Sequence, residues 1–196
     1  MRAITLLFAA LFIGAGYLMS RAGGPPAPAG ATLPPPLITT STRLLVFGDS
    51  LAVGLGPHVR AIVVARGGLA GTRARVGMHM SEGAASLGNV LDEEKPTVVM
   101  VSLGTNDCAS AQQGAGQAKF ALELARAAHE RGVELVWIGL PTLPAKLAGA
   151  EDVREILRAV PGTTYLDSTK MNFARSADGV HATPSGYADW AAQLLG

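Results

Sequence analysis

The sequence predicts an α/β protein with three layers, α/β/α, around a central, mostly parallel sheet of about five strands. Short apolar runs alternate with longer helical stretches from Leu44 to Leu195. The runs are apolar at nearly every residue instead of every second one, which is typical of strands buried on both faces. Strands of this kind that alternate with helices form a parallel sheet covered on both sides.

Five segments are predicted as strands, and most are rich in aliphatic or aromatic residues. They are residues 44–47, 74–76, 97–103, 134–140 and 164–166, of which 74–76 is the weakest. The helices are predicted over residues 51–65, 82–94, 116–131, 151–160 and 184–195. The last helix is expected to start with Thr183 as its cap and Pro184 in its first turn.

Composition limits the class of protein. The chain has 196 residues, 48% hydrophobic and 16% charged, which suits one folded domain. Its formal net charge is +1, or −1 without residues 1–22, so it lacks the positive charge that nucleic-acid binding requires. A single cysteine excludes an intramolecular disulfide framework and a CxxC zinc site.

The N-terminal part predicts export. The 18 residues 3–20 are uncharged and mostly apolar, a length between that of a signal-peptide core and that of a spanning helix. We expect residues 1–22 to be either a signal peptide or an N-terminal membrane anchor, with the remainder periplasmic or extracellular. Residues 23–39, rich in proline and glycine, are expected to be a linker, followed by the folded domain over residues 40–196.

Polar residues follow the predicted strands, at the edge where parallel sheets bind ligands. Ser50 comes after the first strand, Gly77 after the second and Asn106 after the third. Near the C-terminus, Asp178 precedes His181 by three residues, so its carboxylate can reach Nδ1 and leave Nε2 free for a serine proton. A serine, a base and backbone or amide donors are the groups that nucleophilic acyl transfer needs.

These residues lie in four blocks: GDSLAVG around Ser50, ARVGMHM around Gly77, SLGTND around Asn106 and DGVHATPSGY around His181. In order and spacing the blocks resemble those of the SGNH hydrolases, also called GDSL lipases or esterases, over the whole domain. The second block departs from the family pattern, which often has a Gly-x-Ser-Gly-like loop there. Gly83 is therefore the alternative to Gly77.

The resemblance implies a flavodoxin-like α/β/α fold and an acyl-enzyme mechanism that uses no metal or cofactor. By position, Ser50 corresponds to the nucleophile, His181 to the base and Asp178 to the partner of the base. The backbone N–H groups of Ser50 and Gly77 and the side-chain amide of Asn106 correspond to the oxyanion hole.

Four other residues in or next to these blocks have different expected roles. Asp49 is expected to hold the loop around Ser50 through a hydrogen bond, and Asp107 to cap a helix. His79 either lines the acyl or sugar pocket or is an exposed loop residue. Cys108 is expected to be a buried small side chain instead of a second nucleophile.

The sequence thus predicts an extracytoplasmic serine esterase that acts on a small-molecule or carbohydrate ester. We expect a short acyl chain, such as the O-acetyl groups of envelope carbohydrate, because a domain of this size leaves little chain for a lid or an acyl tunnel. The alternative is an O-acyltransferase that passes the acyl group to a polysaccharide hydroxyl. A membrane partner is expected only through the N-terminal segment, and no oligomeric state is predicted.

Overall fold

The computed structural model describes residues 38–196. The expected export segment or anchor, residues 1–22, and almost all of the expected linker, residues 23–39, lie outside the described residues. The described chain starts with Ile38, which packs partly buried against the core, and a turn in which Thr42 N–H donates to the Thr39 carbonyl at 3.0 Å. Within this part of the chain, no helix has the length and apolar character needed to cross a membrane.

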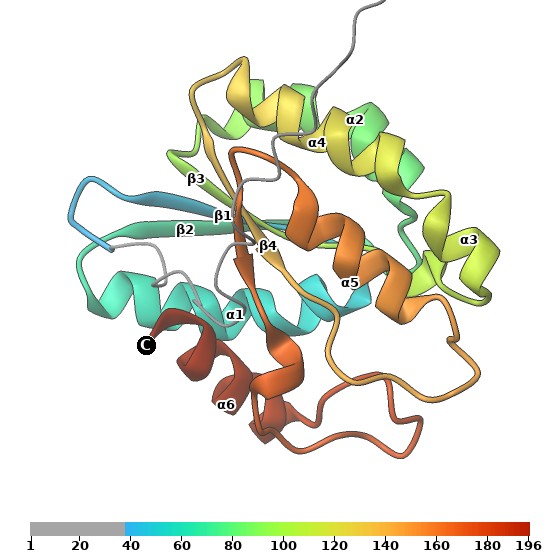
Figure 1. The fold of residues 1–196 in the computed structure, drawn as a ribbon. Helices are drawn as coiled ribbons and strands as arrows, with labels where there is room; N and C mark the ends of the chain where they lie inside the picture. The colour runs from blue at the N-terminus through green and yellow to red at the C-terminus, as the bar shows by residue number, and fades with distance from the viewer. Residues whose placement is uncertain (1–37) are drawn as a thin grey trace, which may run out of the picture. The chain divides into compact units, whose positions relative to one another are not determined.

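Five strands form the central sheet in the order β2-β1-β3-β4-β5 (Figure 1). They are β1 (Arg43–Gly48), β2 (Leu69–Ala74), β3 (Val98–Ser102), β4 (Glu134–Ile138) and β5 (Thr164–Leu166). All four strand pairs are parallel, so every strand ends at the same edge of the sheet. The prediction of a parallel sheet of about five strands is confirmed.

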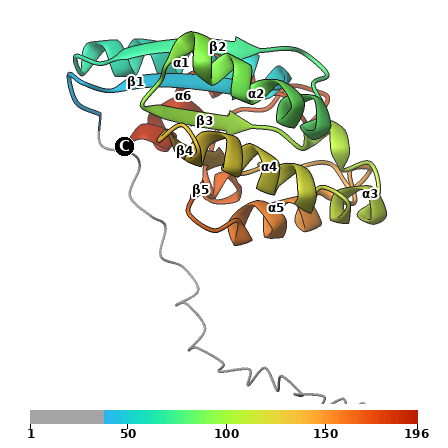
Figure 2. The same cartoon turned by 90° about the horizontal axis from the view of Figure 1, so that it is seen from above.

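Helices cover both faces of this sheet (Figures 1 and 2). The α-helices are α1 (Ser50–Ala65), α2 (Met80–Glu94), α3 (Ala111–Ala115), α4 (Ala118–His129), α5 (Ala150–Ala159) and α6 (Pro184–Leu195). Helices α1 and α6 share one hydrophobic cluster with the sheet, whereas α2, α4 and α5 share the other. As predicted, α6 begins with Thr183 as its cap, whose hydroxyl accepts the Gly186 N–H, and with Pro184 in its first turn.

Alternate residues of each inner strand supply the two clusters. In β1, Leu45 and Phe47 face the cluster under α2 and α4, whereas Leu44 and Val46 face the cluster under α1 and α6. All four side chains are at most 2% exposed. Because both faces of the strand are buried, the run is apolar throughout, as the sequence indicated.

Two predicted elements are wrong in part. The strand predicted at residues 74–76 is β2, which lies earlier, at Leu69–Ala74, and is followed by a turn. This edge strand is half exposed and has the sequence LAGTRA, so it offers no apolar run to recognise. The helix predicted over residues 116–131 is α4, and a separate short helix, α3, precedes it.

Candidate active site

Ser50 follows β1 directly because Gly48 turns the chain at the end of the strand. Gly48 has a φ of +148°, and a Cβ there would collide with the Ser102 carbonyl oxygen. The Asp49 N–H donates to that same oxygen at 3.0 Å, and the Gly48 carbonyl accepts the Arg75 N–H at 2.9 Å. The end of β1 is thus tied to the chain that follows β2 and to the end of β3.

Ser50 is the first residue of α1, and Asp49 caps this helix. The Asp49 Oδ1 accepts the Leu51 N–H at 2.9 Å, which satisfies one of the free donors at the helix N-terminus. The prediction that Asp49 holds this loop by a hydrogen bond is confirmed. Its position places the Ser50 hydroxyl at the positive end of the helix dipole, where negative charge is stabilised.

The Asp49 carboxyl group is buried beside Ser50. Its side chain is inaccessible to solvent, and its Oδ2 has no hydrogen-bond partner among the described residues. Burial raises the pKa of Asp49 to about 7, because an ionised carboxylate loses its hydration there. The Leu51 N–H and the Thr105 side chain lower this pKa in part; of the more distant charges, Asp107 raises it and His181 lowers it.

Asp178 and His181 form one compact turn before α6. The Asp178 Oδ2 lies 2.6 Å from His181 Nδ1, and its Oδ1 accepts the N–H groups of Val180 and His181 at 2.9 and 3.0 Å. The bond to His181, followed by those two backbone bonds, holds the pKa of Asp178 well below its usual value. Because an ionised carboxylate only accepts, Nδ1 carries the proton of a neutral His181 ring.

The other ring nitrogen of His181 faces Ser50. Nε2 lies 2.9 Å from the Ser50 Oγ, although the two residues are 131 positions apart. The structure therefore brings Ser50, His181 and Asp178 into one hydrogen-bonded series. A neutral Nε2 in this position accepts the serine proton, and the carboxylate fixes the ring that does so.

Arg175, which sequence analysis did not single out, ties the Asp178–His181 turn to the rest of the domain. Its Nη2 donates to the carbonyl of Thr142, in the loop after β4, and to the carbonyl of Gly179 inside the turn, both at 3.0 Å. Its guanidinium carbon lies 5.0 Å from the centroid of the Phe173 ring. A contact to backbone carbonyls leaves no trace in the sequence, so only the fold reveals it.

The structure places Gly77 and Asn106 on two loops that flank the end of β1. The Asn106 Nδ2 donates to the Met78 carbonyl at 3.1 Å, and because this nitrogen carries two hydrogens, one remains for a ligand. Gly77 has a φ of +75°, yet a Cβ there would meet nothing within 4 Å. Glycine is therefore needed for its backbone conformation, and the space in front of it is open.

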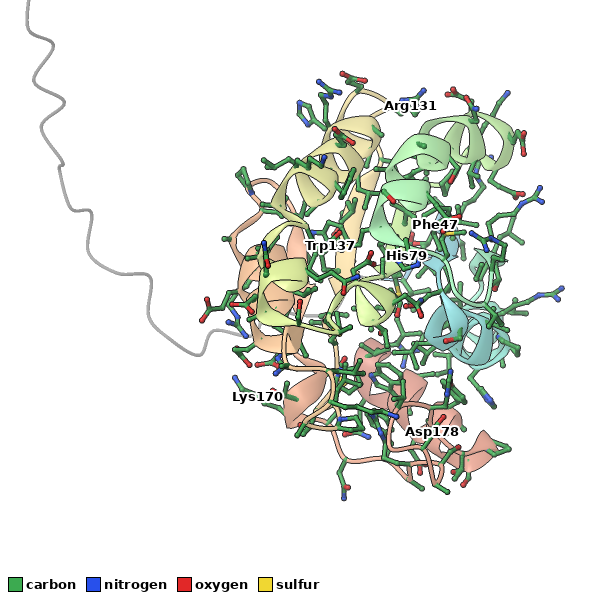
Figure 3. The ribbon with its side chains drawn as sticks, turned by 90° about the vertical axis from the view of Figure 1, so that its right-hand side faces the viewer. Phe47, His79, Arg131, Trp137, Lys170 and Asp178 are labelled. Carbon is green, nitrogen blue, oxygen red and sulfur yellow. The ribbon has the colours of Figure 1, made fainter. Side chains whose placement is uncertain are left out.

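A second histidine–aspartate pair lies at the same edge. His79 Nδ1 is 2.9 Å from Asp107 Oδ1, and the side chains are 47% and 6% exposed. The other Asp107 oxygen accepts the Met80 N–H at 3.0 Å and so binds the first turn of α2 from another loop. The N-cap residues of α2 and α3 are His79 and Ser110, so the prediction that Asp107 is itself a helix cap is wrong. Figure 3 shows this side of the domain, with His79 toward its upper part and Asp178 toward its lower part.

Cys108 is a buried packing residue, as predicted. Its thiol donates to the Thr105 carbonyl at 3.2 Å, and burial raises its pKa to about 11. Within residues 38–196, no three His, Cys, Asp or Glu side chains gather as a metal-ligand set. Cavities of about 270 and 490 Å³ lie along α1 and β2, away from Ser50 and His181.

Several solved structures with this architecture are named as GDSL-like lipases, SGNH hydrolases or acylhydrolases. A lipase/acylhydrolase from Enterococcus faecalis has a TM-score of 0.63 and 19% identity, over 79% of this chain and 93% of its own. A candidate SGNH hydrolase from Slackia heliotrinireducens has a TM-score of 0.60 and 21% identity, over 79% and 97% of the two chains. The chain has the SGNH hydrolase fold.

This SGNH fold also matches the psychrotrophic esterase EstA from Pseudoalteromonas sp., with a TM-score of 0.64 and 12% identity, over 79% of this chain and 94% of that one. No protein-family model and no curated protein sequence matches the chain. At identities this low, likeness of structure establishes the fold, and the chemistry has to be argued from the side chains.

Proposed function

We propose that the chain is a serine esterase that hydrolyses carboxylic esters, with Ser50 as its nucleophile. The observation that carries this proposal is the hydrogen-bonded series from Ser50 through His181 to Asp178, at 2.9 and 2.6 Å. The SGNH fold and the lipase and esterase names of several structural neighbours support it.

Acylation begins when the Ser50 Oγ attacks the ester carbonyl carbon. His181 Nε2 takes the hydroxyl proton as the new C–O bond forms, and Asp178 stabilises the imidazolium through Nδ1. The tetrahedral intermediate collapses when His181 returns this proton to the leaving alcohol oxygen and the ester C–O bond breaks. The products of this half-reaction are the free alcohol and an acyl group on Ser50.

The negative charge of the intermediate is stabilised by donors at the strand ends. We propose the N–H groups of Ser50 and Gly77 and the second amide hydrogen of Asn106 for this role, since all three follow the strands β1, β2 and β3. The α1 dipole adds to it at Ser50. In deacylation, water attacks the acyl carbon while His181 takes its proton; the bond from this carbon to the Ser50 Oγ then breaks, His181 returns the proton to Ser50, and the carboxylic acid leaves.

We propose short acyl esters as substrates and a site of action outside the cytoplasm. Within residues 38–196, the longest helix inserted between β2, β3 or β5 and the core helix that follows is α3, with five residues, which leaves little chain for a lid. The apolar residues 3–20 are the sequence feature that favours export.

The first experiment measures p-nitrophenol release from acetate and octanoate esters by the full chain in detergent. Ser50→Ala is expected to lower kcat about 10⁴-fold or more. Ser86→Ala is the matched control, because Ser86 lies on α2 and its hydroxyl only donates to helix carbonyls. Activity that survives in Ser50→Ala, or a preference for octanoate over acetate, would contradict the mechanism or the short acyl chain, respectively.

A fluorophosphonate identifies the nucleophile without a choice of ester. The Ser50 Oγ forms a bond to phosphorus, fluoride leaves, and the serine proton passes to His181. Intact mass is expected to show one adduct on the wild-type chain and on Ser86→Ala, and none on Ser50→Ala. An added sugar acceptor in the acetate assay tests the acyltransferase alternative, which predicts an acetylated sugar as the main product.

A further inference from the structure

We propose that His79 is a substrate-binding residue that selects esters bearing free hydroxyl groups, and that Asp107 positions its ring. The inference rests on the proposed esterase function of Ser50 and names the class of substrate. Because the catalytic series uses a different histidine, the role of His79 can be tested separately from it.

The position of His79 connects it to the site. It follows Gly77 by two residues in the loop after β2, and its partner Asp107 follows Asn106 directly after β3. These are the two loops that supply proposed oxyanion donors, and the Asn106 Nδ2 bond to the Met78 carbonyl joins them at 3.1 Å. The exposed part of the ring lies on the side of the domain where the strands end (Figure 3).

The ring is held in one orientation. Nδ1 is bound at 2.9 Å by Asp107, whose side chain is only 6% exposed and whose second oxygen is fixed by the Met80 N–H at 3.0 Å. The His79 N–H donates to Glu82 at 2.8 Å, and Glu82 is held in turn by Arg75 at 2.7 Å. A side chain that is fixed before the ligand arrives loses little entropy on binding.

The free edge of the ring has no partner in the described chain. No hydrogen bond among residues 38–196 engages Nε2 of His79, while the side chain as a whole is 47% exposed. His79 is the N-cap residue of α2 and forms a capping box with Glu82, whose carboxylate accepts the His79 N–H at 2.8 Å, while the Met80 N–H donates to Asp107. Nε2 is therefore a polar atom on a fixed, half-exposed ring, in the loop that also carries Gly77.

The chemistry of this atom favours a hydroxyl group. With Nδ1 bound to Asp107, Nε2 accepts a hydrogen bond when the ring is neutral and donates one when the ring is protonated. A hydroxyl group can pair with Nε2 in either state, because it both donates and accepts. An anionic ligand is disfavoured because the carboxylates of Asp107 and Glu82 adjoin the ring, and Arg75 is already paired with Glu82. A sugar ester carries several hydroxyls, whereas an alkyl ester of the same size carries none.

The test compares two acetates of primary alcohols on six-membered rings, methyl 6-O-acetylglucoside and cyclohexylmethyl acetate. The readout is the ratio of kcat/KM for the sugar ester to kcat/KM for the cyclohexyl ester, measured with the full chain in detergent. His79→Ala is expected to lower this ratio about 3- to 10-fold, the loss of one hydrogen bond. His79→Gln, whose amide reaches the position of Nε2, is expected to retain most of it.

His129→Ala is the control, because His129 is an exposed residue in the last turn of α4. If His79→Ala lowers kcat/KM for both esters equally, or lowers kcat/KM for neither, the inference is wrong. If the wild-type chain hydrolyses no ester, the esterase proposal fails, and the role of His79 is then tested by measuring the binding of the two esters. Titration of ¹³C-histidine-labelled Ser50→Ala would then have to move the His79 NMR signal with the sugar ester and leave it in place with the cyclohexyl ester.

Discussion

Asp178 and His181 sit three residues apart in one exposed turn, whereas Asp107 and His79 come from different loops and meet across the ends of β3 and β2. Both pairs join a carboxylate to Nδ1, at 2.6 and 2.9 Å. The carboxylate of the first pair is 45% exposed, and that of the second is 6% exposed. The same chemical unit is therefore built once from local sequence and once from the fold.

Because of this difference, we expect loss of Asp178 to affect activity more than stability, and loss of Asp107 to affect stability more than activity. The Asp178 carboxylate accepts three hydrogen bonds from its own turn, so its removal disturbs the ring of His181 and little else. The Asp107 carboxylate joins a loop to the first turn of α2, so its removal disturbs the fold as well as the ring of His79. Four substitutions examine this contrast.

Asp178→Asn is expected to have the largest effect on activity. An amide can present its N–H₂ to Nδ1 and hold the wrong tautomer, so kcat for p-nitrophenyl acetate is expected to fall about 10²- to 10⁴-fold. The melting temperature is expected to change little, because the side chain is exposed. Asp189→Asn, on the exposed face of α6, is the control. A loss of stability that exceeds the loss of activity would show that this pair is structural.

Asp107→Asn is expected to show the opposite balance. An asparagine can keep the Met80 bond through its oxygen only if its N–H₂ faces the His79 Nδ1, so a neutral contact replaces the bond from the ring to a carboxylate. The free energy of unfolding is expected to fall by about 1–3 kcal/mol, as when a hydrogen bond to a charged group is lost. Urea unfolding measures this fall, and the accompanying loss of kcat is expected to be smaller than in Asp178→Asn. A stability equal to that of Asp189→Asn would contradict the structural role.

Arg175→Ala tests whether the local pair is as independent as its sequence suggests. Without the bonds to Thr142 and Gly179, the Asp178–His181 turn loses its tether, and kcat is expected to fall about 3- to 10-fold through misplacement of His181. KM is expected to change less than kcat. Arg126→Ala, on the surface of α4, serves as the control. An unchanged kcat would mean that the turn holds its geometry alone.

Asp49→Asn is expected to have the smallest effect on kcat of the four substitutions, and its effect is seen instead in the pH dependence of stability. The pKa of Asp49 is raised from 3.8 to about 7 by burial, so the folded chain keeps a proton that the unfolded chain releases above about pH 4. The free energy of unfolding therefore falls as pH rises from about 4 to 7, and Asp49→Asn is expected to remove this fall. Urea midpoints at several pH values measure it, and an identical slope in the variant would contradict the shift.

The Asp178–His181 pair changes the free energy of unfolding with pH in the direction opposite to Asp49. Because its hydrogen bonds lower the pKa of Asp178, its stabilising effect is present above the unfolded value of 3.8 and is lost as the pH falls further. The carboxyl group of Asp178, which belongs to the hydrogen-bonded series, and that of Asp49, which lies beside it, thus titrate in separate pH ranges.

The sequence predicted what depends on local pattern. The apolar runs of β1, β3 and β4 were recognisable because both faces of each strand are buried, and the Asp178–His181 spacing predicted a pair that one turn can close. The edge strand β2 was misplaced because its residues are small and half exposed.

Contacts between loops could not be predicted from the sequence. His79 was expected either to line a pocket or to be an exposed loop residue, and only the fold shows that Asp107, 28 residues away, binds its ring. Arg175 carried no signal, because its partners are the carbonyl oxygens of Thr142 and Gly179, which any residue possesses. Pairings of this kind require the three-dimensional positions of loops that follow different strands.

The close packing of Gly48 against the Ser102 carbonyl affects how activity is lost on heating. Ser50 is anchored through Gly48 and Asp49 to the centre of the sheet, which opens only when the whole domain unfolds. His181 sits on a surface turn held mainly by hydrogen bonds, with Ala182 as its buried neighbour, and such segments open at lower free energy. We therefore expect the position of Ser50, the proposed nucleophile, to persist at temperatures where that of His181, the proposed base, is lost, so that a mildly warmed sample is inactive but folded and regains activity on cooling.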